Sequence, residues 1–240
     1  MTDDVLLEVS NLQTGYGDLR VVRDVSLTVR AGQITVLLGR NGAGKTTTLR
    51  AISGLNRTAG GTVRYLGAPL EDAPHKRVAR GISYVQEGKR VFHELTVEQN
   101  LLLGGFSRRV GKRALIDTLP EIYDLFPILA AKRALPAASM SGGQQQMLAI
   151  GQALMARPKL LILDEPSQGL APVIVKEVME RVHALKQTGL GILLVEQAVQ
   201  DSVAIADEVS VIEMGRTVLS GAASTVTLEE LQKAYFGAAA

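Results

Sequence analysis

The chain of 240 residues contains no cysteine, and aromatic side chains make up only 4% of it. Without cysteine there is neither a disulfide framework nor a thiolate metal site. So few aromatic rings leave little material for the base stacking that proteins use to hold single-stranded nucleic acid. These two shortages exclude a disulfide-stapled fold and indicate that nucleic acid is not a partner.

Long apolar runs and a dominant charge sign are also missing. A membrane span needs about 18 consecutive apolar residues, and LGILLV (190–195) is among the longest runs here. The opening stretch, MTDDVLLEVS, lacks the basic-then-apolar layout of a secretion signal. The net charge is +2, and basic pairs such as Arg108/Arg109 and Lys132/Arg133 are scattered, which is typical of a solvated face. We therefore expect a soluble, globular, intracellular protein.

What is present is enough apolar material for a sizeable core, at 46% of the residues, so we expect a single domain spanning 1–240. Helical patterns alternate with several β-branched or leucine-rich runs, which predicts an α/β fold with a mostly parallel sheet. The predicted strands are 5–9, 34–38, 82–86, 160–164 and 191–195, followed by an antiparallel hairpin at 209–219 that turns at Met214-Gly215.

The middle of the chain, residues 88–157, has helical periodicity and few strand signals. Thr96 with Gln99, and Ser141 with Gln144, are spaced as capping boxes and predict two helix starts. We interpret this stretch as a helical lobe inserted into an α/β core that consists of residues 1–87 and 158–240. The terminal AAA (238–240) is expected to fray.

A phosphate-binding loop is indicated by GRNGAGKT (39–46), which matches G-x-x-x-x-G-K-[ST] between the strand ITVLL and the helix-compatible TTLRAI. Its glycines let backbone N–H groups turn inward around phosphate oxygens at a helix start. Lys45 can supply charge to the β- and γ-phosphates, and the Thr46 hydroxyl can ligate Mg²⁺. An ordinary glycine turn is the alternative, but the flanking strand and helix favour a site for ATP and Mg²⁺. The candidate nucleotide-binding residues are Gly39, Asn41, Gly42, Ala43, Gly44, Lys45, Thr46 and Thr47.

A second element of that site is indicated by LLILDEP (160–166), in which four apolar residues precede Asp164. The carboxyl end of such a strand is where α/β sheets bind ligands. Asp164 could hold Mg²⁺ directly or through water, and Glu165 is a candidate base for the attacking water. A DE pair ending a strand is by itself more often a turn, so this interpretation depends on the phosphate loop.

SGGQ (141–144) lies shortly before the LLILDEP strand. The guanine-reading motif N-K-x-D of small GTPases is missing, and a small-molecule kinase would not explain SGGQ. Across essentially the whole chain, GRNGAGKT, SGGQ and LLILDEP in this order closely resemble the nucleotide-binding subunits of ABC transporters. That resemblance implies the cassette fold of the family: a P-loop NTPase, RecA-like core of mostly parallel sheet, with an inserted helical lobe and an antiparallel β element.

The resemblance also assigns roles to residues outside the phosphate loop. In this family two subunits pair head to tail, and the SGGQ helix of one closes on the ATP held by the other. It follows that Ser141, Gly142, Gly143 and Gln144 would serve a partner's nucleotide. Tyr16, in TGYGDL, matches the aromatic that stacks on adenine, with an ordinary loop tyrosine as the alternative. SQGLAP (167–172) matches the segment that crosses the dimer interface.

Three departures from the usual family pattern point to a subgroup. YVQE places Gln86 in the usual proline register and Glu87 in the glutamine register, Ala171 replaces a common aspartate, and Gln197 replaces the histidine that faces the γ-phosphate. In all three departures the chain resembles one subgroup of the family, the second ATP-binding subunit of bacterial branched-chain amino acid importers and its urea- and amide-importer relatives. The catalytic candidates are then Glu165, Gln197 and Glu87, and the metal candidates are Thr46, Asp164 and Gln86. Whether Gln86 or Glu87 acts in the glutamine register stays open.

The resemblance further implies partners. These are a second ATP-binding subunit in a head-to-tail pair, identical or different, two membrane-spanning permease subunits, and a separate solute-binding protein. The apolar Val91, Phe92 and Leu95 would face the permease, or alternatively pack into the lobe. The expected location is the cytoplasmic face of the plasma membrane, and the expected solute is a branched-chain amino acid. A urea or short-amide importer, an ABC ATPase acting on nucleic acid, and a non-hydrolysing regulatory cassette are the alternatives.

Overall fold

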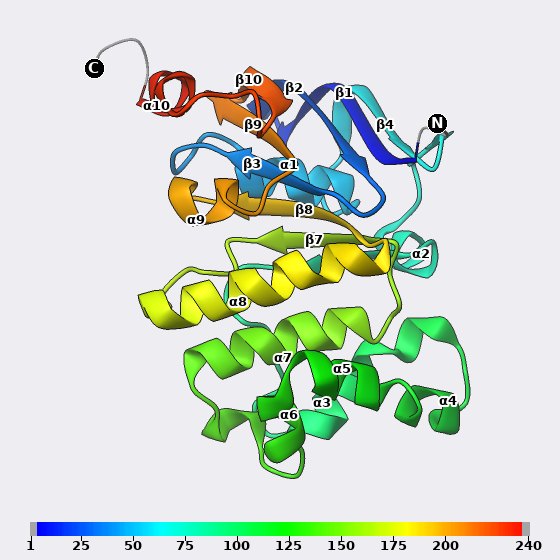
Figure 1. Ribbon diagram of the computed structural model, residues 1–240. Helices are drawn as coiled ribbons and strands as arrows, with labels where there is room; N and C mark the ends of the chain where they lie inside the picture. The colour runs from blue at the N-terminus through cyan, green and yellow to red at the C-terminus, as the bar shows by residue number, and fades with distance from the viewer. Residues whose placement is uncertain (1–3, 237–240) are drawn as a thin grey trace.

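The computed structural model describes residues 4–236 (Figure 1), so the terminal AAA lies outside the described residues. Its strands form one ten-stranded sheet. They are β1 (Val5–Tyr16), β2 (Leu19–Arg30), β3 (Ile34–Leu38), β4 (Thr58–Tyr65), β5 (Ala68–Pro69), β6 (Ile82–Val85), β7 (Leu160–Asp164), β8 (Gly191–Glu196), β9 (Glu208–Glu213) and β10 (Arg216–Ala222).

Helices flank the sheet, and most of those from the middle of the chain gather on one side of it (Figure 1). The α-helices are α1 (Lys45–Ile52), α2 (Pro74–Ala79), α3 (Val97–Gly104), α4 (Lys112–Ile116), α5 (Leu119–Leu125), α6 (Pro127–Ala131), α7 (Gly142–Leu154), α8 (Pro172–Leu185), α9 (Val199–Val203) and α10 (Leu228–Phe236). Short 3₁₀ turns are η1 (Phe106–Arg108), η2 (Ala137–Ser139) and η3 (Lys186–Thr188).

The strand order in the sheet is β5-β4-β1-β2-β10-β9-β3-β8-β7-β6. Strands β9, β3, β8, β7 and β6 run parallel, whereas β1, β2, β4 and β5 pair antiparallel, as do β9 and β10. The two parts meet at β2 and β10, which are joined by the single pair Arg216↔Asp24. Every residue of β3, β7 and β8 is buried, because these central strands are covered on both faces and therefore read as continuous apolar runs.

All of the predicted strands are present, and the hairpin turns at Met214-Gly215 as expected. Strands β2, β4 and β5 were not predicted from the sequence, and β1 was predicted to end too early. In β1 the apolar alternation stops at Ser10 and the pairing shifts register several times, so the residues of its second half do not read as a strand. Backbone pairing to β2 and β4 extends this strand where its local pattern gives no signal.

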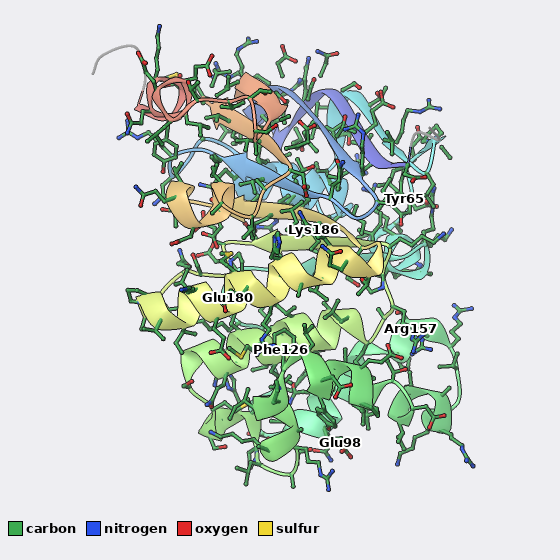
Figure 2. All side chains as sticks on the ribbon, viewed as in Figure 1. Tyr65, Glu98, Phe126, Arg157, Glu180 and Lys186 are labelled. Carbon is green, nitrogen blue, oxygen red and sulfur yellow. The ribbon has the colours of Figure 1, made fainter. Side chains whose placement is uncertain are left out.

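Residues 97–154 supply helices α3 to α7, which lie together below the sheet in Figure 1. Both predicted capping boxes are confirmed, at Thr96/Gln99 and Ser141/Gln144. Phe126 is 1% exposed in the cluster that joins these helices to one face of the sheet, and Tyr65 is fully buried on the other face (Figure 2). Within residues 4–236 no helix is long and apolar enough to cross a membrane.

Candidate nucleotide site

The carboxyl ends of β3, β7 and β8 and the start of α1 enclose a pocket of about 280 Å³. These parallel neighbours end at one edge of the sheet, which brings together residues that are far apart in the sequence. The pocket is lined by Val21, Asn41, Gly42, Gly44, Lys45, Thr46, Thr47, Glu87, Glu165, Gln168 and Gln197. Most of the predicted phosphate-loop and catalytic residues therefore share one site.

The loop before α1 has the shape that a phosphate cradle requires. Gly42 and Gly44 have φ angles of 81° and 108°, which L-residues with side chains rarely adopt. No side chain among the described residues caps the start of α1. Gly44 and Lys45 at this start line the pocket, where the amino end of a helix favours an anion. Gly39 has a different reason to be glycine, because a Cβ there would lie 2.5 Å from the Ile212 carbonyl oxygen.

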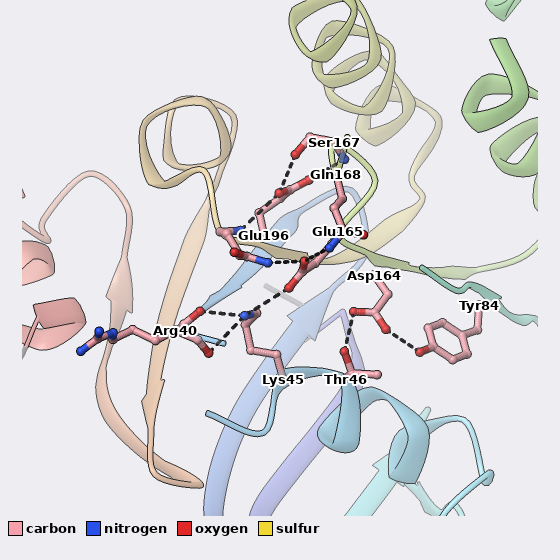
Figure 3. Close-up of polar contacts among 11 residues, drawn as sticks. Arg40, Lys45, Thr46, Tyr84, Asp164, Glu165, Ser167, Gln168 and Glu196 are labelled. Atoms are coloured by element: carbon pink, nitrogen blue, oxygen red, sulfur yellow. Dashed lines mark hydrogen bonds and ion pairs between the residues drawn. The ribbon is translucent and has the colours of Figure 1, made fainter. Parts of the chain in front are cut away.

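Lys45 is the cation of this pocket, and its side chain is only 4% exposed. Its Nζ donates to the Gly39 carbonyl at 2.7 Å and lies 3.2 Å from Glu165 Oε1 (Figure 3). A buried ammonium is stable only beside an anion, which here is the Glu165 carboxylate. A bound phosphate group would compete with Glu165 for the Lys45 ammonium.

Asp164 ends β7 and is 2% exposed. Its Oδ1 accepts a hydrogen bond from the Thr46 hydroxyl at 3.2 Å, and its Oδ2 accepts one from the Tyr84 hydroxyl at 2.7 Å (Figure 3). Burial raises the pKa of the Asp164 carboxyl, and the hydrogen bonds from Tyr84 and Thr46 offset part of that rise. A hydroxyl and a carboxylate oxygen side by side are the ligand types that Mg²⁺ takes, so this pair fits the ion.

The raised pKa of Asp164 leads to a stability prediction. The folded chain holds this proton more tightly than the unfolded chain, so folding stability is lost as pH rises from about 4 through the pKa of the folded state. Asp164→Asn removes that loss, and its amide can still bond both hydroxyls. We expect the nucleotide-free Asp164→Asn protein to have a larger free energy of unfolding than the wild type at pH 7. This difference in free energy should narrow as the pH falls toward 4.

Urea unfolding of both proteins between pH 4.5 and 8 measures this gap. Thr46→Ser, which keeps a hydroxyl beside Asp164, is the matched control and should follow the wild-type pH profile. An Asp164→Asn protein less stable than the wild type at pH 7 would contradict the assignment of a net electrostatic cost to this carboxylate.

Glu165 follows directly and is 8% exposed, with a positive φ of 47°. Its amide donates to the Val195 carbonyl at 2.9 Å, which pins this unusual backbone to β8. Its Oε2 accepts hydrogen bonds from Gln197 Nε2 and, at 3.3 Å, from Gln168 Nε2. With Lys45 on the other oxygen, the carboxylate is oriented by three donors. A carboxylate held in this way at a phosphate pocket can accept a proton from water.

The structure separates Gln86 from Glu87. Glu87 lines the phosphate pocket, whereas Gln86 lines a second pocket, of about 240 Å³, with Arg90, Gly104 and Gln152. Gln86 is thus not among the residues that line the pocket with Thr46, and its role as a metal ligand stays a prediction. Glu87 is the one of the two that lines the phosphate pocket, and which of them acts in the glutamine's role stays open.

Tyr16 lies at the edge of this site and does not line the pocket. The residue is 46% exposed, its hydroxyl lies 3.4 Å from Thr47 Oγ1, and the Arg50 guanidinium carbon is 5.9 Å from the ring centroid. The ring is therefore accessible next to the phosphate loop, as a stacking role requires.

The SGGQ residues lie outside this chain's own pocket. The capping box is formed by Ser141 and Gln144 at the start of α7, and both Ser141 and Gly142 are exposed. Gly143 is buried, and a Cβ on it would lie 2.3 Å from Ile174 Cγ2 of α8. Within the described residues, the close neighbour of Gly143 is α8, and its approach to a partner's nucleotide stays a prediction.

Tyr84 and Glu196 were not predicted from the sequence, and Ser167 and Gln168 were expected only as part of the interface segment 167–172 (Figure 3). Tyr84 stands in YVQE and Glu196 directly precedes Gln197, so their place beside known motifs was the available signal. Tyr84 bonds to a residue 80 positions away and Ser167 to one 29 positions away, and a local sequence pattern does not show such contacts. Gln168 bonds to Glu165 across a tight loop.

Residues 22–168 match a family model described as ABC transporter. The high-affinity branched-chain amino acid transport ATP-binding protein BraG of Pseudomonas aeruginosa is 42% identical, covering 97% of this chain and 100% of that protein. A probable branched-chain amino acid transport ATP-binding protein LivF of Archaeoglobus fulgidus is 35% identical, over 94% and 95%. The lipopolysaccharide export system ATP-binding protein LptB of Escherichia coli K12 is 32% identical, over 96% and 97%.

Solved structures agree with these relatives. The ATP-binding subunit of an ABC transporter superposes with a TM-score of 0.80 at 31% identity, covering 95% of this chain and 92% of the other. An ATP-binding cassette solved in its ADP conformation gives a TM-score of 0.84 at 25% identity, with 95% and 94% covered. The fold, with its phosphate loop and helical insertion, is thus that of a known ATP-binding cassette. This chain belongs to the ABC transporter family, whose ATP-binding subunits are ATPases coupled to transport.

Proposed function

We propose that this chain binds and hydrolyses ATP to energise an importer of branched-chain amino acids. The observation that carries the solute assignment is the 42% identity to BraG, which spans both chains almost from end to end. Relatives named for lipopolysaccharide export are less similar, at 32%. A urea or short-amide importer is the alternative solute assignment that the subgroup pattern leaves open.

In this proposal the residues of the pocket divide the work. Lys45 and the start of α1 bind the phosphates, and Thr46 and Asp164 would hold Mg²⁺, which when bound neutralises charge on the phosphate oxygens. Glu165 accepts a proton from the attacking water at its carboxylate. Because Lys45 pairs with Glu165 at 3.2 Å, binding of a phosphate to Lys45 releases Glu165 from this ion pair and leaves it held by the two glutamines.

The partners follow from the placement of SGGQ. Ser141 and Gly142 are exposed and stand apart from their own pocket, which supports presentation to a second ATP-binding subunit, here proposed to be a different chain. The lobe of residues 88–157 would carry this signature, and residues 1–87 and 158–240 the pocket. Two permease subunits and a separate solute-binding protein complete the proposed complex at the cytoplasmic face of the membrane. Of the three apolar residues assigned to the permease, Val91 is buried, Leu95 is half-buried and Phe92 is 55% exposed, so Phe92 is the most accessible.

Gln197 gives a prediction about rate. A histidine in this register can carry a positive charge near its usual pKa of about 6.5, whereas glutamine cannot. We expect Gln197→His, in a complex whose sister subunit has its catalytic glutamate disabled, to raise turnover at this site several-fold and to add a pH dependence near 6–7. Steady-state ATP hydrolysis across pH 5.5–8.5 measures both effects. Gln197→Asn, which shortens the amide and adds no charge, is the control, and an unchanged rate with a flat pH profile would contradict the prediction.

The solute is tested by purifying the complex from its host through a tag on this chain and reconstituting it in liposomes with its co-purifying binding protein. We expect leucine, isoleucine or valine to stimulate ATP hydrolysis and to be taken up. Stimulation by urea or acetamide, without stimulation by leucine, would replace the proposed solute and leave the ATPase assignment standing.

A further inference from the structure

Two pairs of adjacent residues interlock around Glu165. Ser167 and Gln168 follow β7, while Glu196 and Gln197 close and follow β8 (Figure 3). Gln168 and Gln197 both donate to Glu165, as described above. Ser167 and Glu196 form hydrogen bonds with each other. In each pair, therefore, the glutamine contacts Glu165 and the other residue takes part in a second contact beside it.

That second contact is a clamp on Ser167. The backbone N–H of Ser167 donates to Glu196 Oε1 at 2.9 Å, and its hydroxyl donates to Glu196 Oε2 at 2.8 Å. The Gln197 N–H also donates to Oε2, at 3.2 Å. Three donors therefore converge on one carboxylate, and an ionised carboxylate is the side chain that offers acceptors alone.

The clamp lies deep in the protein, because Glu196 is 1% exposed. Within residues 4–236 no lysine or arginine forms an ion pair with it. Burial raises the pKa of the Glu196 carboxyl, the hydrogen bonds from Ser167 oppose the rise, and the nearby Glu165 adds to it. A buried carboxylate without a cation is costly, which argues that its geometry serves the site more than the stability of the fold.

The segment that starts at Ser167 runs toward the SGGQ helix. A Cβ on Gly142 would lie 3.8 Å from Leu170 Cδ2, so Leu170 stands beside the start of α7. The chain from Ser167 to Leu170 thus links the surroundings of Glu165 to the helix that a partner's nucleotide would meet. Among the side-chain carboxylates of the described residues, that of Glu196 is the one that ties the beginning of this segment to β8.

We propose that Glu196 is a positioning residue, which holds Ser167 to the end of β8 so that Gln197, Glu165 and the segment Ser167–Ala171 keep one arrangement. Glu196 does not line the phosphate pocket, so its effect is on turnover and not on nucleotide affinity. This inference rests on the proposed function, because it concerns ATP hydrolysis at the same site.

The test uses Glu196→Gln in the assembled complex, where the amide N–H groups of glutamine would face the donors of Ser167 and Gln197. We expect turnover to fall about tenfold, as for a modest misplacement of reacting groups, while the Kd for MgATP stays within about twofold of wild type. Glu180→Gln, on the exposed face of α8 (Figure 2), is the matched control and should change neither quantity.

Ser167 provides the second arm of the experiment, in case the Glu196→Gln variant is poorly folded. Ser167→Ala should lower turnover by a smaller factor at unchanged Kd, and Ser167→Thr, which keeps the hydroxyl, should restore it. The double variant Glu196→Gln/Ser167→Ala should be no slower than Glu196→Gln alone, because both changes break the same contact.

Turnover of Ser167→Ala equal to wild type, or multiplicative losses in the double variant, would overturn the positioning role. Failure of the proposed function has a different signature. A wild-type complex that neither binds nor hydrolyses MgATP would remove the function and this inference together, whereas normal wild-type hydrolysis with unaffected Ser167→Ala and Glu196→Gln variants would remove the inference alone.

Discussion

Glu165→Gln is expected to lower ATP turnover in the assembled complex by about 10²–10⁴-fold, the contribution of a well-placed general base. Nucleotide affinity should be retained or improved. In the wild type, Lys45 Nζ is shared with Glu165 Oε1 at 3.2 Å, and a neutral glutamine removes this competitor for the phosphates. The variant should therefore hold ATP without cleaving it.

Single-turnover hydrolysis and equilibrium MgATP binding measure these two effects separately. Glu180→Gln makes the same chemical change at an exposed position and should leave both at wild-type values. If Glu165→Gln cleaved ATP at the wild-type rate, Glu165 would not be the base, and Glu87 would be the remaining carboxylate in the pocket to examine.

Lys45→Ala should weaken MgATP binding about 10- to 100-fold, because a hydrogen bond to a charged group is worth about 1.5–3 kcal/mol. Its ammonium is the buried cation of the pocket, at 4% exposure, and the Gly39 carbonyl holds it in place at 2.7 Å. Removing it also leaves Glu165 buried with amide donors alone, so the free energy of unfolding should fall as well.

Titration with MgATP well below the melting temperature of the variant separates lost affinity from lost fold. Lys112→Ala, at an exposed position of α4, is the control for removing a lysine and should bind as the wild type does. Unchanged affinity in a folded Lys45→Ala protein would show that the loop at 39–46 does not bind the phosphates through this side chain.

The features that could be predicted from the sequence are those that depend on residues close together along the chain. The all-buried strands β3, β7 and β8 read as apolar runs, and the capping boxes at Thr96 and Ser141 depend on spacings of three residues. The phosphate loop is equally local, since its glycines, lysine and threonine act within one turn between a strand and a helix. The amino-acid sequence alone is therefore enough to place these features.

Long-range contacts could not be placed in this way. The bond from Tyr84 to Asp164 joins β6 to β7, and the bond from Ser167 to Glu196 joins the loop after β7 to β8. Only the order of β6, β7 and β8 in the sheet brings these residues together. Gln197 was assigned to a γ-phosphate by resemblance, and the structure adds its bond to Glu165. Gly143 fits the signature pattern, and the structure adds a packing reason for glycine there, the proximity of Ile174.

ATP-driven uptake of leucine by liposomes that contain the complete complex tests the central claim most directly. We predict uptake that requires MgATP inside the compartment corresponding to the cytoplasm, that scales with the ATP hydrolysed, and that is abolished by Glu165→Gln in this chain together with the corresponding change in its partner. Leucine uptake that persists at the wild-type rate in that double variant would contradict the account.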